Sequence, residues 1–174
     1  MTRRVPHGPA GTAHRAVGRR TTLRAAAGAL SLAGLAGCLG RSRPAPRGPL
    51  AALGPVDVLK EAGCTCCEAN ADYLRGYGVT VDVTALDDLA ATMERYRIPE
   101  AAASCHVAVG DDYVVVGHVP AAAIEVLLTD RPDAVGIALP GMPSGSPGMG
   151  GQKAGAFTVL RIDRAGGLAP FAEV

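Results

Sequence analysis

Three of the chain's five cysteines, Cys64, Cys66 and Cys67, lie at a change in sequence pattern. The run before them, 56–60, contains β-branched residues and predicts a strand. The run after them, 68–77, contains good helix formers and predicts a helix. The fold must therefore present three thiols together at the junction between a strand and a helix.

The rest of the domain alternates between strand-like and helix-like runs. The predicted elements are a strand at 79–83, a helix at 87–96, strands at 105–109 and 113–116, a helix at 120–128 and a last strand at 157–162. Through the helix at 120–128, the order β-α-β-α-β-β-α predicts an α/β fold with a single thioredoxin-like domain. Cysteines at the first strand-to-helix junction make that analogy more specific.

Residues 139–155 are rich in Gly and Pro and fit no regular element. They predict a long Gly/Pro/Met-rich C-terminal loop, and long loops in compact domains are often functional. Met142 and Met149 lie in this loop with no helical face to bury them. Because a thioether is a soft ligand, we expect both to be available to a soft metal ion.

The N-terminal residues have the pattern of an export signal. Residues 1–37 carry six Arg and no acidic residue, and the twin-arginine pair Arg19-Arg20 precedes an uncharged stretch too short to span a bilayer. Basic residues that run directly into an apolar stretch fit targeting better than nucleic-acid binding, so we expect no nucleic-acid partner. The pair partly matches the signal for twin-arginine (Tat) export.

The segment 35–38 reads Leu-Ala-Gly-Cys, which resembles the lipobox of bacterial lipoproteins. We therefore predict a signal peptide over 1–37 and a lipidated Cys38 with a flexible tether over 38–55. The metal-binding domain would occupy 56–174 on the periplasmic or cell-surface side of a membrane, held there by its lipid anchor.

The cysteine spacing favours a metal over a structural disulfide. A bond between adjacent Cys66 and Cys67 would strain the peptide, and a Cys64–Cys66 ring would also be tight. Thiolates select copper(I) and zinc, and a helix N-terminus lowers thiol pKa values and favours the binding form. Zinc sites usually pair two C-x-x-C motifs or add histidines at matching spacing, so the C-x-C-C pattern favours copper(I) over zinc.

Cys105 is expected to supply a fourth thiolate. In thioredoxin-like folds the segment that enters the third strand lies against the N-terminus of the first helix. Successive strand residues point to opposite faces, so Cys105 and His106 are expected to diverge, and a structural role is favoured for His106. His118 ends the next strand and is a candidate ligand or a structural histidine.

A redox function is the alternative. Cys64 and Cys67 have the C-x-x-C spacing of thioredoxin-like enzymes, but Cys66 would compete for disulfide exchange. A binding protein without catalysis is therefore favoured. A thiol-disulfide or copper oxidoreductase and a structural zinc protein stay open.

Four motifs carry a family resemblance: CTCC at 64–67, SCH at 104–106, GHVP at 117–120, and LPGMP followed by GSPGM at 139–149. On these motifs the chain resembles a family of exported C-x-C-C metal-binding proteins that includes the CopG-type copper-resistance proteins. Family members often carry Gly where this chain has Thr65.

The resemblance implies a thioredoxin-like fold and copper(I) bound by the cysteines as a multinuclear cluster. It implies a role in copper sequestration, handling or resistance. The expected partners are copper ions and another copper-handling protein.

Overall fold

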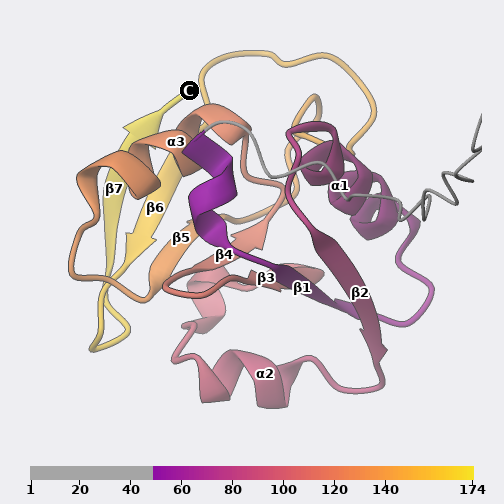
Figure 1. Ribbon diagram of the computed structural model, residues 1–174, viewed down its shortest axis with the longest axis horizontal. Helices are drawn as coiled ribbons and strands as arrows, with labels where there is room; N and C mark the ends of the chain where they lie inside the picture. Colours follow the sequence, from indigo (N-terminus) through magenta and orange to yellow (C-terminus); the bar gives the residue numbers. More distant parts are fainter. Residues whose placement is uncertain (1–48) are drawn as a thin grey trace, which may run out of the picture. The chain divides into compact units, whose positions relative to one another are not determined.

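The computed structural model describes residues 49–174 (Figure 1). The predicted signal peptide, Cys38 and the first part of the predicted tether lie outside these residues. Within 49–174, no helix has both the length and the apolar character needed to cross a membrane.

The described chain folds into helices and one seven-stranded sheet. The elements are η1 (Pro49–Leu53), β1 (Val56–Glu61), α1 (Thr65–Gly76), β2 (Val81–Leu86), α2 (Ala90–Arg95), η2 (Glu100–Ala102), β3 (His106–Val109), β4 (Val114–Gly117), α3 (Ala121–Asp130), β5 (Gly136–Leu139), β6 (Thr158–Ile162) and β7 (Leu168–Glu173). The sheet order is β2-β1-β3-β4-β5-β6-β7. β1 pairs with β2 and β4 with β5 in parallel, and the other pairs are antiparallel. This is the mixed α/β fold that the alternation of patterns predicted.

Helices cover both faces of the sheet. α1 and α3 lie on one side and α2 lies on the other (Figure 1). Side chains alternate across the strands, so Val58 joins the apolar cluster under α1 and α3 while Leu59 packs against the cluster on the α2 side. Helix packing on both faces fixes the strand ends from which the functional side chains project.

The predicted strands and helices between 56 and 128 are present, with shifted ends. The first helix begins at Thr65 rather than at residue 68, so Cys66 and Cys67 belong to its first turn. The second strand lies at 81–86 rather than at 79–83. Patterning located β1 by its alternation of buried and partly exposed residues, and β3 and β4, which are buried on both faces, by their runs of valine.

Two strands were missed. β5 is four residues long and buried throughout like β4, but only Ile137 in it is β-branched, so it lacks the Val run that marked β4; it also takes Leu139 out of the predicted loop. β7 contains Pro170, and a proline within a run of residues argues against a strand. β7 lies at the edge of the sheet, where a residue without an N–H is tolerated.

The prediction of a flexible tether as far as residue 55 was wrong for Pro49–Leu53, which form the 3₁₀ helix η1. Leu50 and Leu53 are 1% and 3% exposed and join the main apolar cluster from η1. Their spacing of three residues places them on one side of a 3₁₀ turn. The folded part of the chain thus begins before residue 56.

One end of the central strands gathers the chemically interesting segments. β1 ends at Glu61 and β4 at Gly117, while β3, antiparallel to both, begins there at His106. β5 also ends at this end of the sheet, because its last residue, Leu139, pairs with Gly117. The Gly/Pro/Met-rich loop starts there. The topology therefore brings the cysteine cluster, both histidines and the start of the loop to one place.

Candidate metal centre

The cysteine segments are joined through the backbone of Glu61. The N–H of Cys64, the residue before α1, donates to the Glu61 carbonyl at 3.2 Å. The N–H of Glu61 donates to the carbonyl of Cys105 at 3.2 Å. One residue at the end of β1 thus positions both Cys64 and Cys105.

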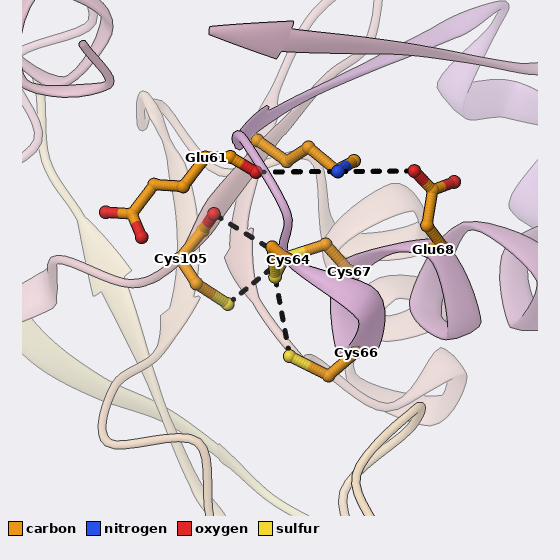
Figure 2. Close-up of polar contacts among 7 residues, drawn as sticks. Glu61, Cys64, Cys66, Cys67, Glu68 and Cys105 are labelled. Carbon is orange, nitrogen blue, oxygen red and sulfur yellow. Dashed lines mark hydrogen bonds and ion pairs between the residues drawn. A yellow bond between two sulfur atoms is a disulfide. The ribbon is translucent and has the colours of Figure 1, made fainter. Parts of the chain in front are cut away.

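The cysteine spacing was expected to favour a metal over a structural disulfide, yet one disulfide forms, at the C-x-x-C spacing of the redox alternative. Cys64 and Cys67 are joined as a disulfide, and Cys66 and Cys105 are free (Figure 2). The start of α1 turns the chain so that the Cα atoms of Cys64 and Cys67 lie 5.5 Å apart, within the usual range for a disulfide. The strain argument holds only for the two closer pairs.

Each free thiol contacts one sulfur of the disulfide. Cys66 Sγ lies 3.4 Å from Cys64 Sγ, and Cys105 Sγ lies 3.4 Å from Cys67 Sγ. The four sulfur atoms lie within 4.8 Å of one another. Cys105, predicted as the fourth member of the cluster, is therefore beside the other three.

The expectation that Cys105 and His106 diverge was wrong. Cys105 precedes β3 and does not follow its regular alternation, so its Sγ lies 3.6 Å from Nδ1 of His106. His118 follows β4, and its Nε2 lies 3.5 Å from the same sulfur. Cys105, His106 and His118 thus form a second group of closely spaced donors that shares Cys105 with the four sulfurs.

Both imidazoles are fully buried and their far nitrogens are hydrogen-bonded. Nδ1 of His118 contacts the carbonyl oxygen of Pro147 at 2.7 Å, and Nε2 of His106 contacts Oδ1 of Asn70 at 3.1 Å. The rings meet edge to face with centroids 4.8 Å apart. An imidazole held through its far nitrogen is the usual arrangement of a metal-binding histidine.

Burial sets the protonation of this group. It lowers the pKa of His106 to about 3, with the neighbouring His118 adding to the effect. It also lowers the pKa of His118, against the smaller opposing effect of the hydrogen bond to Pro147. Burial, followed by the nearby Cys66, raises the pKa of the Cys105 thiol to about 11. At neutral pH the group holds two neutral imidazoles and one protonated thiol.

The donor spacing suits a metal ion. A metal about 2.0 Å from an imidazole nitrogen and about 2.3 Å from a sulfur separates the two by about 3.5 Å at a tetrahedral angle. The two sulfur-to-nitrogen distances at Cys105 are 3.5 and 3.6 Å. Opening the disulfide would add two thiols to a set already spaced for coordination.

The predicted methionines differ in position. Met142 is 40% exposed and lines an open hollow of about 770 Å³ whose wall also contains Cys105 and Met93. Met149 lies in a turn in the middle of the loop, where its N–H donates to the carbonyl of Ser146. The structure therefore places Met142 on a surface shared with a cysteine of the site, and it places Gly148, the neighbour of Met149, against the Cys66 carbonyl of α1.

Lys60 is a buried cation beside the cysteine segment. It is 5% exposed, and its Nζ lies 3.2 Å from Oε1 of Glu68 on the first turns of α1. The same ammonium donates to the Glu61 carbonyl at 3.4 Å, the oxygen that also accepts the Cys64 N–H. Lys60 thereby links the end of β1 to the start of α1 across the cluster.

Sequence reasoning missed Asn70 and Pro147. Asn70 is 2% exposed, although it is a polar residue in the helix that follows the cysteines. A polar side chain between Ala69 and Ala71 on the face that carries the buried Ala71 was the available signal. Pro147 acts through its backbone carbonyl, which no side-chain pattern reveals.

Relatives of this chain are found among proteins of known structure. Two solved structures named copper resistance protein CopG, form 1 and form 2, each share 40% sequence identity and a TM-score of 0.63 with it. The alignments cover 69% of this chain and 96% and 97% of the two CopG chains. The chain belongs to the CopG family. Residues 102–149 of this CopG-family protein also match a family described as a protein of unknown function, DUF411. No curated protein matches the chain.

Proposed function

We propose that this CopG-family protein binds copper(I) and acts in copper sequestration, handling or resistance. The observation that carries the proposal is the convergence of the sulfurs of Cys64, Cys66, Cys67 and Cys105 within 4.8 Å. Thiolates are soft ligands that select copper(I) and zinc over harder ions, and adjacent thiolates can bridge several copper(I) ions. Relatives named copper resistance proteins support the same metal.

The domain core is proposed to be thioredoxin-like. The partial order β2-β1-β3-β4, with β1 and β2 parallel and β3 antiparallel to both of its neighbours, supports this assignment. On this view β5, β6 and β7 extend the core at one edge. The loop between β5 and β6 then brings Pro147 to His118 as part of the extension.

The metal is proposed to bind to the reduced protein as a multinuclear cluster of copper(I). Cys64 and Cys67 become available when the disulfide accepts two electrons and two protons, from an external dithiol for example. His106, His118 and Met142 would complete the coordination around the sulfurs. Met149, next to the Gly148 that packs against α1, stays a predicted ligand.

Export and a lipid anchor complete the proposal. Residues 1–37 would be removed, Cys38 would be lipidated, and the domain would exchange copper with another copper-handling protein outside the cytoplasm. Mass spectrometry of the mature N-terminus in the native host tests this part. Lipidated Cys38 at the N-terminus supports it, and an intact Met1 contradicts it.

Anaerobic titration of the fully reduced protein with copper(I), read by elemental analysis, tests the metal. We expect at least one copper ion per chain and retention against excess zinc. Binding of less than one copper per chain, or ready displacement by zinc, would refute copper(I) as the ligand and favour the zinc alternative.

A second candidate is an oxidoreductase that acts on thiols or on copper. Two observations favour it: the Cys64–Cys67 disulfide at the C-x-x-C spacing, and the Cys105–His106–His118 group, whose one-sulfur, two-imidazole composition suits both common copper oxidation states. The variant Cys66→Ser separates the candidates. Disulfide chemistry through Cys64 and Cys67 should survive it without metal, whereas a cluster bridged by Cys66 should lose copper.

A further inference from the structure

Asn70 stands between the two buried histidines and the loop that covers them. Its Nδ2 donates to the carbonyl oxygen of Pro147 at 3.2 Å, and its Oδ1 lies 3.1 Å from Nε2 of His106. Asn70 lies outside the four motifs, and Pro147, although part of the GSPGM motif, was not among the predicted metal ligands. Their contacts nevertheless determine which nitrogen of each histidine is free.

The chemistry of the carbonyl fixes the orientation of the amide. A carbonyl oxygen only accepts hydrogen bonds, so the Asn70 group that faces Pro147 must be the NH₂. The amide oxygen then faces His106, and because that oxygen also only accepts, Nε2 of His106 must carry the proton. Nδ1 of His106 is consequently unprotonated, and it is the atom 3.6 Å from Cys105 Sγ.

The same carbonyl orients the second histidine. Pro147 oxygen has two lone pairs and accepts from Nδ1 of His118 at 2.7 Å as well as from Asn70. Nδ1 of His118 therefore carries its proton, and the unprotonated Nε2 lies 3.5 Å from Cys105 Sγ. The two rings use opposite tautomers, yet both direct a free lone pair at one sulfur.

Close packing holds Pro147 in place. A Cβ at Gly148 would lie 2.7 Å from the backbone N of Asn70 and 2.9 Å from the carbonyl oxygen of Cys66. Only a residue without a side chain allows the loop to approach α1 this closely. Asn70 is thus contacted through its side chain by Pro147 and approached through its backbone by Gly148.

We propose that Asn70 is a positioning residue that fixes the tautomers of both His106 and His118 as metal donors. It acts on His106 directly and on His118 by holding the shared Pro147 carbonyl. That these tautomers matter for copper binding rests on the proposed function. The tautomers themselves are a property of the metal-free protein. The two can therefore be tested separately.

The first experiment measures the tautomers in the full-length, reduced, metal-free protein by ¹⁵N NMR of the histidine rings. We expect His106 protonated at Nε2 and His118 protonated at Nδ1. Asn70→Leu should shift His106 to a mixture of tautomers, and Asp72→Asn, on an exposed position of the same helix, should change neither ring. Wild-type His106 protonated at Nδ1, or an unchanged His106 in folded Asn70→Leu, overturns the proposal.

A second variant removes only one of the two contacts. Asn70→Asp retains an acceptor for His106 but has no N–H for Pro147. We expect His106 to keep its Nε2 proton, while the His118 Nδ1 proton signal exchanges faster with solvent. An unchanged His118 signal contradicts the bridging role, and the wild-type tautomers test the proposal even if either variant fails to fold.

Copper affinity supplies the functional readout. Competition with a chromogenic copper(I) chelator should show a loss of about 10- to 100-fold for Asn70→Leu, the usual effect of removing a partner of a ligating histidine. Unchanged copper affinity in folded Asn70→Leu, with the tautomers altered, would overturn the functional part. Wild-type protein that binds no copper while showing the expected tautomers would instead refute the proposed function and leave the role of Asn70 intact.

Discussion

Cys105 occupies the central position among the candidate ligands. It belongs to both groups of closely spaced donors, the four sulfurs and the Cys105–His106–His118 set. Its thiol, with a pKa raised to about 11 by burial and by Cys66, is protonated at neutral pH. A metal that binds Cys105 must therefore displace a proton.

This protonation predicts a pH-dependent affinity for copper(I). Between pH 6 and pH 9 the proton on Cys105 opposes binding, so the apparent affinity should rise with pH, by up to about tenfold per pH unit for this one proton. Chelator competition at several pH values in the reduced protein measures the slope. Cys105→Ser should bind more weakly with a slope shallower by one proton, and an equal slope in both proteins would contradict the assignment.

The sequence indicated the reactive residues but not their orientation. The cysteines and histidines were recognisable because their side chains have few other roles in such a pattern. The pairing of Cys64 with Cys67 depends on where α1 begins, and the convergence of Cys105 with His106 depends on where β3 begins. A difference of one residue at an element end reverses the direction of a side chain, and patterning does not locate ends that accurately.

At the scale of elements, the first turns of α1 form the surface on which the site is assembled. They carry two of the cysteines, they pair with β1 through Lys60 and Glu68, and they receive the loop at Gly148. The loop was predicted correctly as irregular but its contact with α1 was not predicted. That contact is made by glycine and by backbone atoms, which leave no periodic signal.

Substitution at Gly148 should detach the loop from the site. Gly148 has φ +80°, and a Cβ there would collide with backbone atoms of α1, so Gly148→Ala should cost about 1–3 kcal/mol and weaken copper binding. Gly150→Ala is the matched control, because nothing lies within 4 Å of its Cβ position. Chemical denaturation and copper titration measure both effects; equal stability of the two variants would contradict the packing described above.

Removing the carboxylate of the Lys60–Glu68 pair should reduce the stability of the protein more than removing the ammonium. Glu68→Gln leaves a buried ammonium without its carboxylate partner and should destabilise the protein by about 1–3 kcal/mol, less than a fully buried pair because Glu68 is half-exposed. Lys60→Met replaces the ammonium with an apolar chain and returns Glu68 to water, so it should cost less. Urea unfolding of the reduced, metal-free variants measures both, and a larger loss in Lys60→Met would contradict this account.

At the scale of the whole molecule, residues 49–174 place the candidate metal ligands at one end of a sheet that is covered on both faces. Alternation of patterns was enough to predict the α/β class and the strands and α-helices between 56 and 128, but not the short 3₁₀ helix η2. Of the extension it predicted β6 at 157–162 but neither β5, which has only one β-branched residue, nor β7, which contains a proline. The burial of Leu50 and Leu53 was not predicted, because two residues are too few to form a periodic pattern.

Buried neutral histidines make the molecule sensitive to acid. The folded pKa of His106, about 3, is below its ordinary value of 6.5, so between these values the unfolded chain binds a proton that the folded chain does not. Stability therefore falls as the pH drops from about 6.5 to about 3, and His118 acts in the same direction. Between pH 7 and pH 5 the loss from His106 should reach about 2 kcal/mol.

Urea unfolding of metal-free protein at the two pH values measures this loss. His106→Asn retains a polar side chain and removes the titrating group, so its stability should depend less on pH than that of the wild type. An equal pH dependence in both proteins would show that His106 is not held neutral by the fold.

The central claim is that copper binds to the converging cysteines, and X-ray absorption at the copper edge tests it most directly. In the reduced, copper-loaded protein we predict a first shell dominated by sulfur with a nitrogen contribution, and a clear loss of sulfur scattering in Cys105→Ser. A first shell of nitrogen and oxygen alone, or a spectrum unchanged by Cys105→Ser, would contradict the account.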